Sequence, residues 1–149
     1  MAFQLIEILS EQEVCGSFAA IQALRPHLSL DQALPQIARQ RLQGYRMLGL
    51  RDESIADLAN PEAIPSFVGF RVAEFLAWGK IIYIDDLSTI DSQRGQGHAS
   101  ILLDHVIAIA REQACSAVHL DSGYARNAAH RLYLNKGFIL SSHHFALQL

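Results

Sequence analysis

A glycine-containing loop joins an apolar strand to an amphipathic helix in the second half of the chain. The segment before it, residues 80–90, is rich in β-branched and aromatic side chains, which favours a strand. Apolar residues then recur at helical spacing between Ala99 and Ala110. Gly95 and Gly97 lie at the junction, where the absence of a Cβ lets backbone N–H groups approach a bound anion closely. Because the helix directs its positive end at the same place, the junction predicts a phosphate or pyrophosphate site.

Two common phosphate loops fit this junction poorly. A Walker A loop needs Lys followed by Ser or Thr after its last glycine, but Gly97 is followed by His98 and Ala99. A dinucleotide fingerprint needs a third glycine where Ser100 stands, and it follows its strand directly, whereas a polar arm at residues 91–94 intervenes here. Asp121 lies roughly where a ribose-binding acid would fall, yet too few residues follow for a second mononucleotide-binding half.

A third pattern, Arg/Gln-x-x-Gly-x-Gly/Ala, is matched by Arg94, Gly97 and Ala99. It resembles the acetyl-CoA pyrophosphate loop of the GNAT N-acetyltransferases. The segment from Ala129 to Phe138 resembles the second CoA-contacting segment of that family, in which a small residue precedes a tyrosine by one helical turn and Gly-Phe follows. Residues four apart share one helix face, so a ligand can approach the small residue beside the phenol.

The resemblance implies an α/β (α+β) class and the GNAT fold in one domain over residues 1–149. The expected sheet is mixed and mostly antiparallel, in the order β-α-α-β-β-β-α-β-α-β-β, with strands 80–90 and 117–121 as parallel neighbours that splay at the CoA site. The patterning predicts strands at 3–8, 45–50, 67–72, 80–90, 117–121, 138–140 and 145–149. It predicts helices from the Ser10–Glu13 capping box to Leu24, from Ser29 to Gly44, over 99–112, and around 129–133.

The resemblance also implies the residues that bind acetyl-CoA as cosubstrate. Many members carry Asn three residues before the small residue of the second segment; here Arg126 stands at that place and Asn127 follows it. Whether Arg126 replaces the family asparagine stays open. The expected cofactor-binding residues are Leu87, Ser88, Thr89, Arg94, Gly95, Gln96, Gly97, His98, Ala99, Ser100, Asn127, Ala129 and Tyr133. The side chain of His98 is expected to point outward.

Acetyl transfer to an amine requires a neutral amine and a proton for the departing thiolate. Asp85 and Asp86 are the candidate catalytic carboxylates, although a strand turns neighbours to opposite faces, so only one would face the groove. Apolar Ile84 and Leu87 fall in different phases, which predicts a β-bulge around the two aspartates. Whether Asp85, Asp86 or a water chain is the base stays open. The resemblance assigns Tyr133 as the acid that protonates the thiolate.

Composition narrows the functional classes. The chain has 149 residues, half of them hydrophobic, which suffices for one core without disulfides or metal. A net charge of −3 offers no basic field for nucleic acid, and no apolar run reaches membrane-spanning length. Isolated Cys15 and Cys115, with no secretory signal, suit the cytoplasm. The seven histidines lack metal-ligand spacing, so no metal is expected.

Two functions follow from these observations. The first is an N-acetyltransferase acting on a primary amine of a small molecule or peptide. The alternative is a non-catalytic acyl-CoA-binding or interaction module with the same fold. The acceptor amine is not identified by any motif, although in this fold it is selected by the early helices and a late loop, here residues 25–29 and 141–144. A homodimer also stays open.

Overall fold

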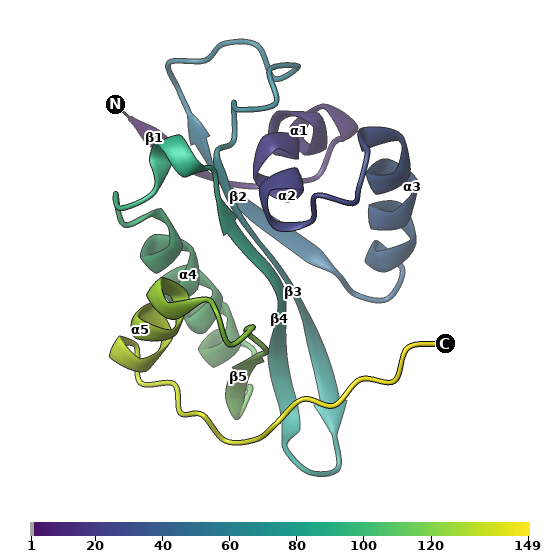
Figure 1. The fold of residues 1–149 in the computed structure, drawn as a ribbon, viewed down its shortest axis with the longest axis vertical. Coiled ribbons are helices and arrows are strands. Elements are labelled where there is room, and N and C mark those ends of the chain that lie inside the picture. Colours follow the sequence, from purple (N-terminus) through teal and green to yellow (C-terminus); the bar gives the residue numbers. More distant parts are fainter. Residues whose placement is uncertain (1) are drawn as a thin grey trace. The chain divides into compact units, whose positions relative to one another are not determined.

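The computed structural model describes residues 2–149, which form two compact parts divided after His119. The first part holds strands and helices in a mixed α/β arrangement (Figure 1). Its helices are α1 (Glu11–Gly16), α2 (Phe18–Leu24), α3 (Leu30–Arg41) and α4 (His98–Glu112), with a short 3-10 turn, η1 (Asp91–Gln93). The strands are β1 (Phe3–Glu7), β2 (Arg46–Asp52), β3 (Ser66–Phe75), β4 (Gly79–Thr89) and β5 (Ala117–Leu120), which crosses the division.

The strands follow one another across the sheet in the order β1-β2-β3-β4-β5. The first four are antiparallel neighbours. β5 begins beside the start of β4, where the Ser116 N–H donates to the Lys80 carbonyl at 2.8 Å. An antiparallel strand starting there would run off the end of β4, so paired β5 must run parallel to it. A four-residue strand that starts just after Ser116 is too short to reach Leu87, Ser88 and Thr89 at the end of β4.

The β-bulge expected around the two aspartates is present between β3 and β4. Gly69 pairs with Asp86 and Phe70 pairs with Ile84, so Asp85 is an extra residue on β4. An extra residue interrupts the alternation of side chains along a strand. The expectation that only one aspartate faces the groove is therefore wrong, since it assumed uninterrupted alternation.

Helices α1, α2 and α3 cover one face of this sheet and α4 packs on the other (Figure 1). The predicted capping box of Ser10 and Glu13 begins α1. Helix α3 begins after Ser29, as predicted, and the structure adds a capping box there between Ser29 and Gln32. The single helix expected from Ser10 to Leu24 is instead two helices that break at Ser17. The break has a tertiary cause, because the Ala19 N–H bonds to the Pro61 carbonyl at 3.0 Å.

Each face of the sheet has its own apolar contacts. On one side, side chains of the first three helices pack with Met47 and Phe67 of the strands. On the other side, α4 buries Leu102, Leu103 and Val106 completely. Among residues 2–149, no helix is both long and apolar enough to cross a membrane.

The second part, from Leu120 to Leu149, contains α5 (Asn127–Asn135). Gly137, at φ +98°, ends the helix as predicted, and the Phe138 N–H reaches back to the Tyr133 carbonyl at 3.0 Å. The closing strands predicted at 138–140 and 145–149 are absent, since residues 138–149 lie in neither helix nor strand. The apolar pattern that predicted them includes Phe145 and Leu147, both exposed. Such a pattern defines a strand face but supplies no partner for the backbone hydrogen bonds.

Candidate functional site

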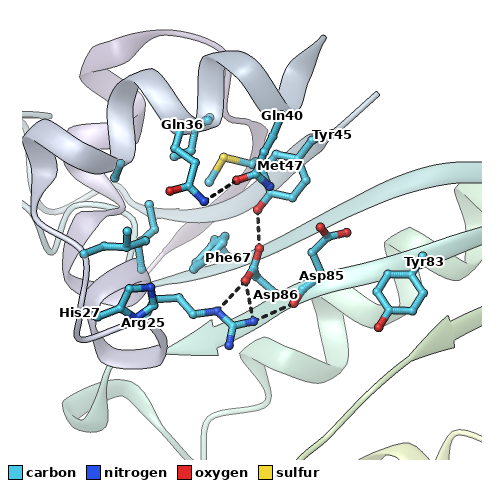
Figure 2. A pocket seen from close by; sticks show the side chains of 14 residues that line it. Arg25, His27, Gln36, Gln40, Tyr45, Met47, Phe67, Tyr83, Asp85 and Asp86 are labelled. Carbon is cyan, nitrogen blue, oxygen red and sulfur yellow. Dashed lines mark hydrogen bonds and ion pairs between the residues drawn. The ribbon is translucent and has the colours of Figure 1, made fainter. Parts of the chain in front are cut away.

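A pocket of about 400 Å³ opens between helices α2 and α3 and the sheet (Figure 2). Asp85 and Asp86 both line it, as does Tyr83 from the same strand. The bulge explains how adjacent strand residues reach one pocket. The other lining residues come from α2, α3, β2, β3 and the loops beside them: Ile21, Arg25, His27, Leu28, Ala33, Gln36, Ile37, Gln40, Tyr45, Met47 and Phe67.

Asp86 is held from two directions. Arg25, the residue that ends α2, contacts Asp86 Oδ1 through Nε at 3.0 Å and through Nη2 at 2.9 Å. Tyr45 donates its hydroxyl to Asp86 Oδ2 at 2.7 Å (Figure 2). The Arg25 Nη2 group also donates to the backbone carbonyl of Asp85 at 3.0 Å. Asp86 therefore has both carboxylate oxygens occupied, and its side chain is only 15% exposed.

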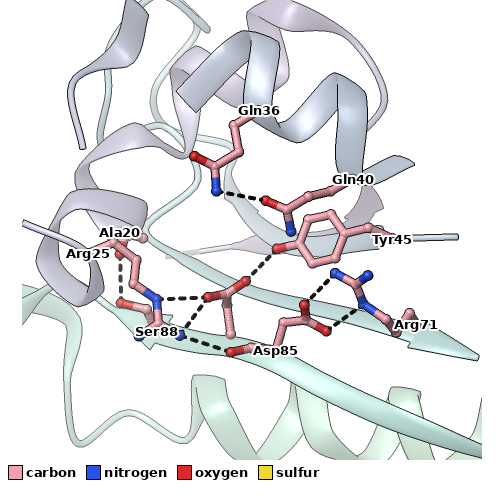
Figure 3. Close-up of polar contacts among 9 residues, drawn as sticks. Ala20, Arg25, Gln36, Gln40, Tyr45, Arg71, Asp85 and Ser88 are labelled. Atoms are coloured by element: carbon pink, nitrogen blue, oxygen red, sulfur yellow. Dashed lines mark hydrogen bonds and ion pairs between the residues drawn. The ribbon is translucent and has the colours of Figure 1, made fainter. Parts of the chain in front are cut away.

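Asp85 is paired separately with Arg71 of β3. The Arg71 Nε donates to Asp85 Oδ1 at 3.1 Å, and its Nη2 donates to Oδ2, in a two-pronged arrangement (Figure 3). Burial raises the pKa of Asp85 above its ordinary value, and Arg71 opposes this effect. The bond to Asp85 raises the pKa of Arg71, so the guanidinium stays charged.

Tyr45 lies between the Asp86 carboxylate and β3. Burial, together with neighbouring Asp86, raises the pKa of Tyr45 well above its ordinary value, so its hydroxyl remains a donor. The ring lies against Gly69, where any Cβ would overlap the Tyr45 hydroxyl. The Arg71 guanidinium lies 5.5 Å from the centre of the same ring. Gly69, Tyr45 and Asp86 thus depend on one another for their positions.

No motif in the sequence marks Tyr45, Arg71, Gln36 or Gln40, which lie before β2, on β3 and on α3, so none of them was predicted. Residues 25–29 were expected to select the acceptor, and Arg25, His27 and Leu28 do line the pocket. On the pocket side of β4, Ser88 donates its hydroxyl to the Ala20 carbonyl at 2.7 Å, which ties the strand to α2 (Figure 3).

The glycine loop begins shortly after β4 ends. Gly95 and Gly97 have φ of +75° and +82°, which glycine adopts without strain, and a Cβ at either would meet open space. Gly97 is the N-cap of the 15-residue α4, and no side chain caps this end. The first N–H groups of a helix have no partner within it, so they are available to an anion. These features fit a pyrophosphate group.

The loop is flanked by Arg94 on one side and by the first residues of α4 on the other. Arg94 donates from Nε to the Thr89 carbonyl at 3.2 Å and pairs with Asp91 at 3.0 Å. Ala99 and Ser100 lie in the first turn of α4. The side chain of His98 is buried, contrary to expectation, because its ring packs edge-on against Phe3 at 4.5 Å. Burial lowers the pKa of His98, which favours its neutral form.

The remaining candidates lie on α5 in the second part of the chain. Asn127 is the first residue of the helix, and Ala129 and Tyr133 follow one turn apart. Burial raises the pKa of Tyr133, so the phenol keeps its proton over the whole neutral range. Its ring centre lies 5.8 Å from that of Phe138. Within residues 2–149, no group of three or more His, Cys, Asp or Glu side chains is arranged to hold a metal ion.

Comparison with known proteins gives one family match and many similar structures. The model of the Acetyltransferase (GNAT) family matches residues 28–138. An uncharacterized N-acetyltransferase, YhdJ, of Bacillus subtilis (strain 168) is 28% identical over 141 residues, which are 93% of this chain and 94% of that protein.

Two solved structures illustrate the similarity of fold. A Trypanosoma brucei acetyltransferase superimposes with a TM-score of 0.77 at 19% identity, covering 99% of this chain and 100% of its own. The AAC(6')-Iy structure, in complex with the bisubstrate analog CoA-S-monomethyl-acetylneamine, gives 0.79 at 11% identity, covering 100% of this chain and 99% of its own.

Proposed function

Because the chain belongs to the GNAT acetyltransferase family and is an N-acetyltransferase, we propose that it acetylates a primary amine bound in the pocket beside Asp85 and Asp86. The amine attacks the thioester of acetyl-CoA directly. One observation carries this proposal: β4 bears both carboxylates on its bulge and leads to the glycine loop that starts α4. A single strand therefore connects an amine-sized pocket to an anion-binding helix end.

The cosubstrate is held mainly by backbone groups. The N–H groups from Gly95 to Ser100 bind the pyrophosphate, supported by the open space beside both glycines and the uncapped helix end. Leu87, Ser88 and Thr89 contact the pantetheine arm along the half of β4 beyond the reach of β5. Asn127 and Ala129 add contacts from α5.

Acetyl-CoA supplies an acyl group that is already activated as a thioester. The new C–N bond forms as the C–S bond breaks, the nitrogen gives up one proton, and the thiolate gains one. Asp85 accepts the proton from nitrogen, because burial gives it greater proton affinity than an exposed aspartate. Asp86 binds Arg25, which also donates to the backbone carbonyl of Asp85, so Asp86 positions the strand around Asp85. Tyr133 donates to the thiolate, which its retained proton permits.

The direct test measures thiol release from acetyl-CoA in the presence of a panel of amines, with mass spectrometry of the amine products. We expect release only when an amine is present, together with an N-acetylated product. Calorimetry with acetyl-CoA alone provides the control for cosubstrate binding. Tight binding of acetyl-CoA without transfer to any amine would instead support the non-catalytic acyl-CoA-binding module.

A further inference from the structure

The charges around the pocket indicate which class of amine it accepts. The following inference rests on the proposed function. We infer that the acceptor is a weakly basic amine, such as the α-amino group of a peptide or amino-acid amide, attached to a small apolar side chain. Polycations such as polyamines are excluded as preferred acceptors.

Both carboxylates of the pocket are already neutralised by arginines of the protein. Arg25 contacts Asp86 at 2.9 and 3.0 Å, and Arg71 engages both oxygens of Asp85. The negative charges of the two aspartates are therefore balanced by the positive charges of the two arginines. The other titratable side chains that line the pocket, such as His27, add no carboxylate that would attract a cation. An ammonium ion entering here would lose its hydration while meeting guanidinium groups beside each carboxylate. The pocket thus gives a cation little net attraction.

A site that does not attract ammonium must capture amines in their neutral form. An α-amino group has a pKa of about 7.7–8.0, whereas an alkylamine such as a lysine side chain has a pKa of about 10.4. At a pH of about 7.5, roughly a third of the α-amino groups but only about 0.1% of the alkylamines are neutral. At equal total concentration, the neutral form of an α-amino group is therefore more than about a hundredfold more abundant than that of an alkylamine.

The rest of the lining suits an apolar side chain. Ile21, Leu28 and Ile37 come from the helical side, and Met47 and Phe67 come from the sheet. A volume of about 400 Å³ is enough for a small molecule or the first residues of a peptide, but modest for a long polyamine or a multi-ring sugar. The pocket therefore combines balanced charge at one wall with an apolar interior.

Three acceptors test the inference with the wild-type protein near neutral pH. Leucyl-glycinamide has an α-amino group on an isobutyl side chain, 3-methylbutylamine has a similar apolar body with an alkylamine, and spermidine is a polycation. We expect kcat/KM for leucyl-glycinamide to exceed the other two by about tenfold or more, because of its larger neutral fraction. With acetyl-CoA held at saturation, we also expect kcat/KM for leucyl-glycinamide to change little between low and high salt, since the pocket lacks net charge.

A substitution that unbalances the charge should alter this preference. Arg71→Gln leaves Asp85 without its guanidinium, so the ratio of kcat/KM for spermidine to that for leucyl-glycinamide should rise about tenfold. The ratio is independent of any general loss of activity in the variant. Arg46→Gln removes an arginine of the neighbouring strand that pairs with Glu7 instead, and it should leave the ratio unchanged.

The possible failures are distinguishable. A wild-type preference for spermidine would overturn the inference while leaving the proposed function intact. So would a kcat/KM for leucyl-glycinamide that falls steeply with salt when acetyl-CoA is saturating. An unchanged acceptor ratio in Arg71→Gln would also overturn it. Transfer to another amine of the wider panel but to none of these three would overturn the inference alone. Transfer to no amine of the panel, although acetyl-CoA binds in calorimetry, would contradict the proposed function.

Discussion

Gly69 shows how one residue without a side chain shapes the pocket. A Cβ at this position would overlap the hydroxyl of Tyr45, which holds Asp86. Gly69→Ala should therefore displace Tyr45 and lower the free energy of unfolding by about 1–3 kcal/mol, the usual cost of overpacking. Urea denaturation measures this change. Gly123→Ala, where a Cβ meets open space, is the matched control, and equal stability of the two variants would contradict the proposed dependence.

Tyr133 is the residue on which the thiolate's proton depends in the proposed chemistry. Tyr133→Phe keeps the ring and its packing against Phe138, so acetyl-CoA affinity should stay within a few-fold. Loss of a positioned acid should lower kcat by about 10²–10⁴-fold. Steady-state kinetics with an accepted amine, with chemistry shown to be rate-limiting, provides the measurement. Unchanged kcat would remove the phenol from the mechanism.

Asp85 makes a prediction about stability and pH. Burial raises its folded pKa above the ordinary value of 3.8, so the protonated carboxyl favours folding. Its stabilising contribution is complete below pH 3.8 and is lost as the pH rises through the folded pKa. The unfolding free energy of the wild type should therefore fall relative to Asp85→Asn as the pH rises through this window. Denaturation of both proteins at several pH values tests the sign, and a constant or rising difference would contradict it.

At the scale of elements, the sequence predicted features that depend on neighbouring residues. It failed where a contact with a distant residue decides the structure. The capping box at Ser10 correctly predicted the start of α1, Ser29 correctly predicted the start of α3, and the interrupted apolar phase correctly predicted the bulge. The break at Ser17 depends on a bond from Ala19 to distant Pro61, which no local pattern reports. The burial of His98 likewise depends on Phe3, far away in the chain.

The glycine loop before α4 has a predicted role that a single substitution can test. Gly97→Val should abolish acetyl-CoA binding, because a bulky side chain would block the approach to the backbone N–H groups. It also places a β-branched residue at φ +82°, so some stability is lost for reasons of backbone strain alone. Gly44→Val, at φ +90° and also in open space, carries the same strain away from the loop. Calorimetry showing equal acetyl-CoA affinity in both variants would contradict the role of the loop.

At the scale of the whole molecule, apolar periodicity, turn residues and the two motifs predicted the order of elements from β1 to α5, except that α1 and α2 were expected to be one helix. The pocket could be predicted only in part. Arg25, Tyr45 and Arg71 meet the aspartates from three separate elements, and no spacing in the sequence brings them together. The closing strands failed for a related reason, since alternation predicts a strand without identifying the edge that pairs with it.

The central claim is that acetyl-CoA and the amine are bound at the same time and react directly. Initial rates measured over a grid of acetyl-CoA and leucyl-glycinamide concentrations test it most directly. The account predicts double-reciprocal lines that intersect, because both substrates must be present before any product leaves. Parallel lines, the pattern of a ping-pong reaction through an acetylated enzyme, would contradict it.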